Sequence, residues 1–209
     1  MNVQQAYSEW ASTYDSDRNL TRDLDQTVTR EALQDLQPSS VLEIGCGTGK
    51  NTALLASIAK EVLALDFSAT MIQQARDKSV FDNVTFTIAD INERWPCRDL
   101  SVDLIACNLV LEHVEHLSFI FAEAARVLNG GGRFFINELH PFRQYQGVQA
   151  HFTRNDAVTE IPAFVHHISD FIAAAAETNL SLAKLQEFWH AEDKGKPPRL
   201  ISFMFEKCT

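Results

Sequence analysis

Short apolar runs alternate along this chain with longer segments in which apolar residues recur at helical spacing. The run Val41–Ile44, which is followed by glycines, is typical of a buried strand, whereas Leu24, Val28, Leu33 and Leu36 recur at helical spacing. Seven strands are predicted in this way, at residues 41–44, 62–65, 84–89, 102–107, 133–138, 180–189 and 200–206. Helices are predicted at residues 3–14, 21–36, 48–59, 68–79, 118–128 and 168–178.

The order of these elements predicts an α/β fold. Strands that alternate with helices are joined by right-handed crossovers, which makes the sheet mostly parallel and places helices on both of its faces. We therefore expect a single domain over residues 1–209 with a doubly wound, seven-stranded sheet. Residues 139–167 are rich in His and aromatic residues, follow neither period and are expected to be irregular. Gly130 to Gly132 are expected to stop the helix before them.

Polar residues stand at or near the ends of the first four predicted strands. They are Glu43, Asp66, Asp90 and Asn108. In an open parallel sheet, ligands bind outside the carboxyl ends of the strands, where the strand order reverses. Four polar residues in equivalent places therefore predict one binding site at that edge of the sheet.

The strongest local signal is the stretch VLEIGCGTG at residues 41–49, in which a strand runs into a glycine-rich turn and a helix. Gly45 permits backbone geometry that other residues resist, and Gly47 and Gly49 leave room for a ligand beside the main chain. The helix that follows offers unpaired amide donors, which suit a carboxylate-bearing ligand. A dinucleotide fingerprint fits less well because its third glycine would come one residue later, at Lys50, and the Lys-Ser/Thr pair of a phosphate loop is missing. A purely structural turn is the other alternative.

Composition and charge narrow the class of partner. The formal net charge is −10 and the positive residues are scattered, so we expect neither a nucleic-acid nor a membrane partner. The four cysteines contain no C-x-x-C pair, which argues against a zinc site and a disulfide framework. The first residues lack a secretory pattern and no apolar stretch is long enough to span a bilayer. We expect a soluble cytoplasmic protein whose oligomeric state stays open.

Four segments in order resemble the class I S-adenosylmethionine (SAM)-dependent methyltransferases. The segments are VLEIGCGTG at 41–49, ALDFSATMI at 64–72, IADINERWP at 88–96 and ACNLVLEHV at 106–114, supported by ARVLNGGGRFFINE at 125–138. The chain is most similar to the small-molecule group that includes the malonyl-carrier-protein and ubiquinone-pathway methyltransferases. The resemblance covers residues 1–138 and implies a Rossmann-like fold and SAM as the cofactor, without indicating the acceptor. It departs from the family at Asn129-Gly130, where Lys-Pro or a similar pair is usual, which concerns only a turn.

The resemblance also implies roles for individual residues. The glycines would line the methionine part of SAM, Asp66 would accept both ribose hydroxyls, and Asp90 would accept from the adenine amino group. Glu43 would organise the glycine turn or the ligand's ammonium group through water. The implied cofactor-binding residues are Tyr14, Glu43, Gly45, Cys46, Gly47, Gly49, Asp66, Phe67, Met71, Asp90, Ile91, Asn108, Leu109 and His113. Structural alternatives stay open: Asp66 as a helix cap, Asp90 as a turn residue, and Phe67 and Met71 as core.

By the same resemblance, residues 1–37 form a helical lid, 38–138 the cofactor-binding core, 139–167 an acceptor-pocket insertion, and 168–209 a C-terminal helix and strands. The candidate catalytic residues are His113, His140 and Arg143, of which the histidines could accept a proton and the arginine could hold a carboxylate. A solvated loop with incidental histidines is an equal alternative. No metal is expected, because the histidines of 139–167 lack carboxylates at ligand spacing.

The expected function is in-line methyl transfer from SAM to an oxygen, nitrogen or carbon of a small-molecule or carrier-bound acceptor. Such a reaction needs alignment and exclusion of water more than a catalytic triad. A non-catalytic SAM-binding regulatory protein is the first alternative. A nicotinamide-dependent oxidoreductase on a similar sheet is the second, and the glycine spacing argues against it.

Overall fold

The computed structural model describes residues 2–154 and 157–209 of the chain. Its strands are β1 (Ser40–Ile44), β2 (Glu61–Asp66), β3 (Val84–Ile88), β4 (Val102–Asn108), β5 (Leu128–Leu139), β6 (His151–Arg154), β7 (Ala157–Glu160), β8 (Leu180–Phe188) and β9 (Leu200–Lys207). Its helices are α1 (Val3–Trp10), α2 (Leu20–Leu33), α3 (Thr52–Ile58), α4 (Ala69–Lys78), the 3-10 turn η1 (Leu111–His113), α5 (Leu117–Val127), α6 (Pro141–Tyr145) and α7 (Ile168–Ala176).

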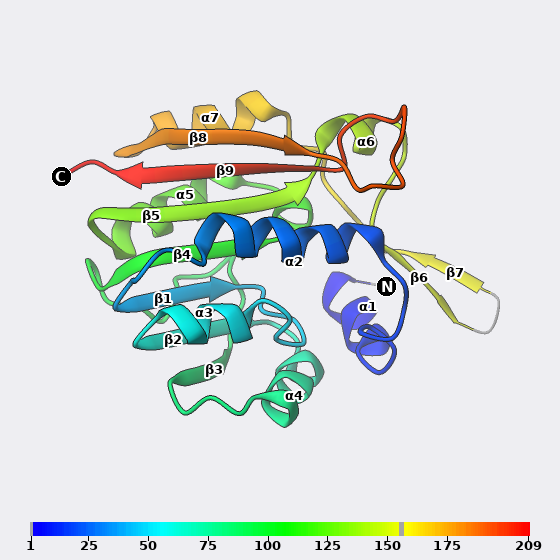
Figure 1. Cartoon of the computed structure of the whole chain (residues 1–209), viewed down its shortest axis with the longest axis horizontal. Helices are drawn as coiled ribbons and strands as arrows, with labels where there is room; N and C mark the ends of the chain where they lie inside the picture. The colour runs from blue at the N-terminus through cyan, green and yellow to red at the C-terminus, as the bar shows by residue number, and fades with distance from the viewer. Residues whose placement is uncertain (1, 155–156) are drawn as a thin grey trace.

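The main sheet has seven strands in the order β3-β2-β1-β4-β5-β9-β8 (Figure 1). Strands β1 to β5 pair in parallel, and β9 lies antiparallel between β5 and β8. The strand order reverses beside β1, whose neighbours are β2 and β4. The predicted seven-stranded, mostly parallel α/β sheet is confirmed, and the reversal beside β1 marks where a ligand site is expected.

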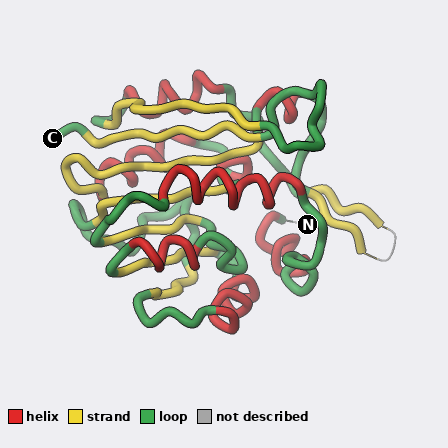
Figure 2. The backbone as a smooth tube through the Cα atoms, viewed as in Figure 1, coloured by secondary structure: helices red, strands yellow, loops and turns green. Residues whose placement is uncertain are grey.

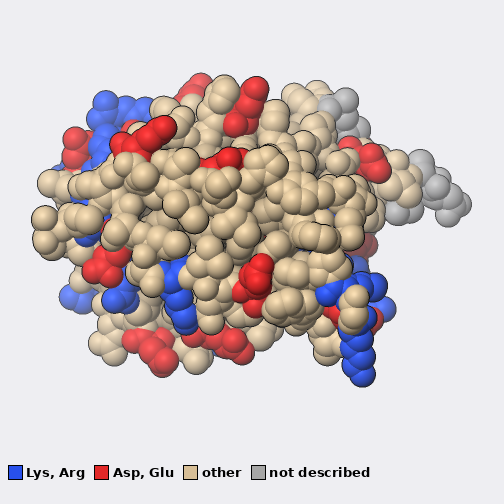
Figure 3. Space-filling model, turned by 90° about the horizontal axis from the view of Figure 1, so that it is seen from above, with Lys and Arg blue, Asp and Glu red and all other residues tan. Residues whose placement is uncertain are grey.

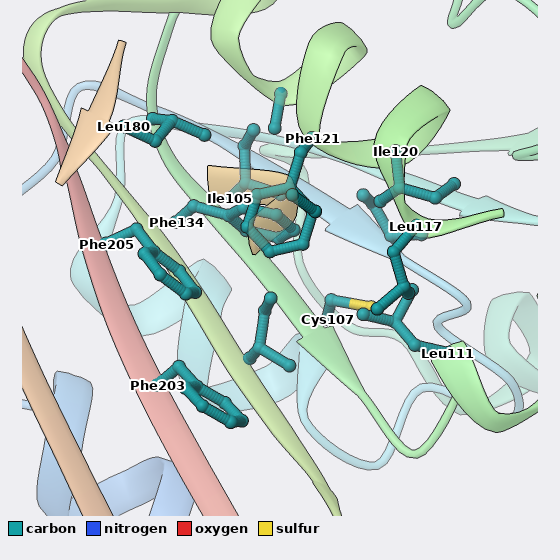
Figure 4. Close-up of a cluster of buried hydrophobic side chains, with 14 of the residues drawn as sticks. Ile105, Cys107, Leu111, Leu117, Ile120, Phe121, Phe134, Leu180, Phe203 and Phe205 are labelled. Carbon is teal, nitrogen blue, oxygen red and sulfur yellow. The ribbon is translucent and has the colours of Figure 1, made fainter. Parts of the chain in front are cut away.

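Helices cover both faces of this sheet because its central strands, such as β1 and β4, are buried on both faces (Figure 2). Val41 packs in a cluster with Val28 of α2 and Leu55 of α3, whereas its neighbour Leu42 packs in another cluster with Phe121 of α5. The second cluster continues through the phenylalanines of β5 and β9, including Phe134 and Phe205, whose ring centroids lie 6.5 Å apart (Figure 4). The alternation of side chains along β1 thus builds two cores, and α1 is left beyond the carboxyl end of the parallel strands (Figure 1).

Several predicted boundaries were wrong for local reasons. The helix predicted at 48–59 begins only at Thr52, because the chain from Gly45 to Gly49 turns through positive φ angles. The helix predicted at 3–14 ends at Trp10. The three glycines predicted to stop a helix lie inside β5, where Gly131 has a φ of +75° and the register with β4 shifts between Val102 and Leu104. These glycines therefore shape an irregular strand start and not a helix end.

The segment 139–167 is more regular than predicted. It contains the short helix α6 and a hairpin of β6 and β7, which pair only with each other, while residues 155–156 lie outside the described part. Both elements are too short to show a period. Phe152 of β6 packs in a buried cluster with Trp10 of α1.

The surface and the helices add two general findings. On the face shown in Figure 3, acidic and basic side chains are interspersed and do not form one field of a single sign. Within residues 2–154 and 157–209, no helix combines the length and the apolar character needed to cross a bilayer.

Candidate cofactor and active site

A cavity of about 370 Å³ lies at the carboxyl ends of β1, β2, β3 and β4. Its volume falls within the range of pockets that enclose ligands of drug-like size. Residues predicted for the cofactor site that line it are Tyr14, Gly45, Gly47, Asp66, Phe67, Met71, Asp90, Ile91, Asn108, Leu109 and His113. The sheet therefore brings segments far apart in sequence to one cavity, although their contacts with a cofactor stay predictions.

The glycine turn uses its two cavity-lining glycines differently. At Gly45, with a φ of +66°, a Cβ atom would lie 2.2 Å from Cγ2 of Val110, so only glycine lets the turn approach the segment after β4. At Gly47, with a φ of +54°, a Cβ atom would meet nothing within 4 Å. The turn is thus close-packed at Gly45 and open at Gly47, as a ligand beside the main chain requires.

Asp66, at the end of β2, is held in place by two backbone amides. Its Oδ2 accepts from the Gly47 amide at 2.9 Å, and its Oδ1 accepts from the Ser68 amide at 2.8 Å. Burial raises the pKa of Asp66 to about 6, against the opposing effect of these two hydrogen bonds. The N-cap of α4 is Ser68, whose hydroxyl accepts from the Met71 amide. Each carboxylate oxygen still has lone-pair capacity, which suits a vicinal diol.

The β3 end of the cavity combines one polar and several apolar side chains. Oδ1 of Asp90 accepts from both the backbone and the side-chain nitrogen of Asn92 at 2.9 Å, so Asp90 does form the turn considered as an alternative. Ile91, Phe67 and Met71 line the same region. The arrangement offers apolar surface to a flat ring and one carboxylate at its edge, which fits an adenine.

Asn108, at the end of β4, belongs to a buried polar network that the sequence did not reveal. Its Nδ2 donates to Asp25 and Thr29 of α2 at 2.7 Å, and Asp25 also accepts from Asn51 and Asn137. Asp25 and Thr29 are buried residues four apart on the face of α2 that also buries Val28. Two polar residues at that spacing among apolar ones were the available signal. The network holds α2 against the ends of β4 and β5.

Helix α1 closes one side of the cavity, where its Tyr7 contacts His113 of η1. Nδ1 of His113 faces the Pro162 carbonyl at 2.8 Å and must donate to it, so in the neutral ring Nε2 accepts from the Tyr7 hydroxyl at 2.8 Å. Burial lowers the pKa of His113, which keeps the ring neutral. Gln4 also donates to the Phe67 carbonyl at 2.6 Å. Contacts of α1 with the strand-end loops on two sides make it suited to cover a bound ligand.

Replacing Tyr7 with Phe removes the hydroxyl that α1 places on His113 but keeps the ring beside Trp10, 6.0 Å away between centroids. Loss of one neutral hydrogen bond costs about 0.5–1.5 kcal/mol, so S-adenosylhomocysteine should dissociate about 2–10 times faster. Stopped-flow displacement measures this rate. Tyr145→Phe is the matched control, because its hydroxyl bonds His167, which does not line the cavity. Equal dissociation rates for the Tyr7 variant and the wild type would refute the covering role.

Two predicted catalytic residues are not brought to the cavity. His140 accepts from the Phe142 amide and bonds Glu187 at 2.8 Å. Arg143 is buried and donates to the carbonyls of Pro197 and Pro198. These contacts tie α6 to β8 and to the loop before β9, and the catalytic roles of His140 and Arg143 stay predictions.

Three residues predicted to bind the cofactor do not line this cavity, although two of them, Glu43 and Cys46, line a smaller cavity of about 50 Å³ that shares Gly45 and Gly47 with it. Gly49 packs against Ala75 of α4, and Cys46 is buried with a pKa that burial raises well above its usual value. Oε2 of Glu43 accepts from the Thr52 hydroxyl at 2.5 Å. The lining residues that the sequence did not indicate are Asn2, Val3, Gln4, Ala89, Asn92, Val110 and Val114. Four of these, Ala89, Asn92, Val110 and Val114, lie in the segments IADINERWP and ACNLVLEHV that carry the resemblance, which was the usable signal.

Glu43 should make stability depend on pH. Burial raises its pKa to about 8 from an ordinary value of 4.5, against the opposing hydrogen bond from Thr52. Between these values the folded state keeps a proton that the unfolded chain releases, so the free energy of unfolding falls as pH rises. Glu43→Gln should make this decline shallower, by at most about 1.4 kcal/mol per pH unit, in urea denaturation from pH 5 to 8. The control is Glu61→Gln at an exposed position. Parallel profiles for Glu43→Gln and the wild type would contradict the assignment.

Comparisons with known proteins find methyltransferases among the proteins similar to this chain. A family model described as "Methyltransferase domain" matches residues 42–136. A malonyl-[acyl-carrier protein] O-methyltransferase of Xylella fastidiosa is 32% identical over 172 residues, covering 78% of this chain and 56% of that protein. A demethylmenaquinone methyltransferase of Tropheryma whipplei is 32% identical over 170 residues, covering 80% of this chain and 64% of that protein.

Among solved structures, the N-methyltransferase NodS of Bradyrhizobium japonicum, in complex with S-adenosyl-L-homocysteine, has a TM-score of 0.74 at 18% identity. The match covers 99% of each chain and shows a shared fold. This chain spans little more than half the length of the curated relatives it matches. The family match within the cofactor-binding core, the two relatives and the common fold show that the chain belongs to the class I SAM-dependent methyltransferase family.

Proposed function

We propose that the chain catalyses methyl transfer from SAM to a small-molecule or carrier-bound acceptor. The observation that supports this best is the junction of Asp66 with the open Gly47, where a buried carboxylate and an accessible main chain meet in one cavity. The relatives' names describe one acceptor on a carrier protein and one demethylmenaquinone, so the acceptor class stays broad.

The residues present fit this cofactor. Asp66 would hold the ribose, the turn at Gly45 and Gly47 would receive the methionine part, and Phe67 and Ile91 would flank the adenine. When bound, SAM supplies an electrophilic methyl group on a sulfonium, which an acceptor displaces in line. The chain's own contribution is to bind and orient the reactants, while α1 excludes water from the cavity.

Calorimetry with S-adenosylhomocysteine tests the site, and methyl-labelled SAM with phenols, amines and carboxylates tests turnover. We expect S-adenosylhomocysteine to bind and one acceptor class to be labelled. Binding without turnover across the panel would favour a non-catalytic SAM-binding protein. Displacement by NADH would favour an oxidoreductase, and absence of S-adenosylhomocysteine binding would refute the proposal.

A further inference from the structure

A second cavity of about 260 Å³ adjoins the cofactor cavity. Tyr7, Tyr14 and Leu109 line both, so the two spaces meet at these side chains. A molecule in the second cavity would lie next to the cofactor, on the side covered by α1. Its volume suits a molecule of one ring with short substituents and is smaller than a cofactor pocket.

Two buried polar atoms beside this second cavity have no hydrogen-bond partner within residues 2–154 and 157–209. They are Oε2 of Glu112, on η1, and Nε of Arg22, on α2. Each side chain is only 7% exposed. Buried donors and acceptors without partners are rare because each costs free energy, so such a pair indicates a site built for a ligand with complementary groups.

The lining of the second cavity carries charged groups of both signs. Glu112 comes from η1 after β4, whereas Arg18, Arg22 and Arg199 gather at the start of α2, where Arg199 donates to Thr21 at 3.0 Å. Arg18 and Arg199 have acidic partners, but the Arg22 guanidinium donates to the backbone carbonyls of Tyr14 and Asp17. A ligand should therefore place a hydrogen-bond donor towards Glu112 and an anionic group towards the arginines.

Aromatic side chains also line the second cavity. Trp10 and Tyr14 meet edge to face at 4.7 Å between ring centroids, and Tyr7 lies 6.2 Å from Tyr14. Rings arranged in this way favour a flat aromatic ligand. Arg22 lies over the Tyr14 ring at 4.0 Å, which fixes its guanidinium beside these aromatic rings.

Resting on the proposed function, we infer that the second cavity is the acceptor site for a small aromatic acid whose hydroxyl or amino group is the nucleophile, and that Glu112 takes the proton of that group. In the step, the O–H or N–H proton passes to Oε2 of Glu112 while the nucleophile bonds to the methyl carbon. The carbon–sulfur bond breaks with its electron pair left on sulfur, which yields the methylated acceptor and S-adenosylhomocysteine. Glu112 then releases the proton to water.

The surroundings of Glu112 suit a proton acceptor. Burial raises the pKa of Glu112 to about 7, against the opposing hydrogen bond of Gln144, so the carboxyl can both accept and release a proton near neutral pH. Its Oε1 lies 3.8 Å from Nε2 of His113, which is already engaged with Tyr7. A carboxylate nucleophile would instead meet the like charge of Glu112 at close range.

The test measures binding to the S-adenosylhomocysteine-loaded protein by calorimetry. The probes are para-hydroxyhydrocinnamate, para-aminohydrocinnamate, unsubstituted hydrocinnamate and tyramine, which share one ring and a similar length. We expect the hydroxy or the amino acid to bind at least about tenfold more tightly than hydrocinnamate, which lacks the donor, and than tyramine, which lacks the anion. Methyl-labelled SAM then shows which of the two acids is methylated, which identifies the nucleophile.

In the Glu112→Leu variant, the hydroxy or amino acid should bind no more tightly than hydrocinnamate. Glu112→Gln keeps an acceptor oxygen but takes no proton, so this variant should keep part of the preference for the hydroxy or amino acid. The matched control is Glu115→Gln, an exposed glutamate on the same segment, which should leave it unchanged. Unaltered S-adenosylhomocysteine affinity and melting temperature show that a variant is folded. The inference fails if hydrocinnamate or tyramine binds as tightly, if Glu112→Leu keeps the preference, or if no probe binds at millimolar concentration. Failure of the wild-type protein to bind S-adenosylhomocysteine would instead refute the proposed function.

Discussion

Replacement of Gly45 with alanine is expected to abolish S-adenosylhomocysteine binding and to destabilise the fold. Gly45 has a φ of +66°, and a Cβ atom there would lie 2.2 Å from Cγ2 of Val110. The left-handed conformation costs a residue other than glycine about 1–2 kcal/mol, and an extra methyl group in a packed region costs about 1–3 kcal/mol. The free energy of unfolding in urea should therefore fall by about 2–5 kcal/mol.

The effect of conformation can be separated from that of the clash. Gly147, with a φ of +81°, has open space where a Cβ atom would lie, so Gly147→Ala carries only the conformational cost. This control should lose about 1–2 kcal/mol and bind S-adenosylhomocysteine normally. If Gly45→Ala matches Gly147→Ala in both measurements, the turn does not depend on close approach to Val110.

The parallel strands could be predicted because the central strands of the sheet bury both of their faces. Val41 and Leu42 pack in different clusters, so only Glu43 interrupts the apolar residues of β1, and Leu104 to Cys107 of β4 form an unbroken apolar run. Asp66 was predictable because a carboxylate directly after such a run lies at the carboxyl edge of the sheet. For a residue that directly follows a buried parallel strand, the place in the sequence therefore already indicates the edge of the sheet at which it lies.

The same logic fails in the segment 139–167. His140 and Arg143 were chosen for their chemistry, but no periodicity there indicates where a side chain points. Their partners come from the loop before β9 and from β8: Arg143 donates to Pro197, and His140 bonds Glu187. Contacts between segments so far apart in sequence cannot be derived from spacing, so these hydrogen bonds became visible only in the fold.

Buried charge was the other feature hidden from the sequence. Glu112 stands beside His113, which the sequence indicated, yet nothing in ACNLVLEHV shows that the glutamate is buried with an oxygen that lacks a partner. Asp25 likewise resembles an ordinary helix residue until Asn51 and Asn108 are placed around it. Desolvation of a carboxylate depends on the three-dimensional packing around it, which a local sequence pattern does not indicate.

Replacement of Asp66 with asparagine is expected to weaken S-adenosylhomocysteine binding about a hundredfold. The carboxylate accepts from the Gly47 and Ser68 amides and would also accept from two ribose hydroxyls. Asparagine has one acceptor oxygen, and its NH₂ group would oppose one of these two amides. Hydrogen bonds to a charged group contribute about 1.5–3 kcal/mol each, and about 2.7 kcal/mol corresponds to a hundredfold change in the dissociation constant.

The pH dependence of binding distinguishes a direct contact from a merely structural role. Because burial raises the pKa of Asp66 to about 6, its protonation at lower pH removes acceptor capacity. Affinity of the wild type should therefore rise between pH 5 and 7 and then level off, while Asp66→Asn should lose that rise. Asp77→Asn on the exposed side of α4 makes the same chemical change and should retain both the affinity and the rise. A wild-type affinity that is constant from pH 5 to 7, or an Asp66→Asn affinity within about threefold of wild type, would mean that the ribose contacts something else, because a carboxylate bonded to two hydroxyls cannot be protonated or replaced without cost.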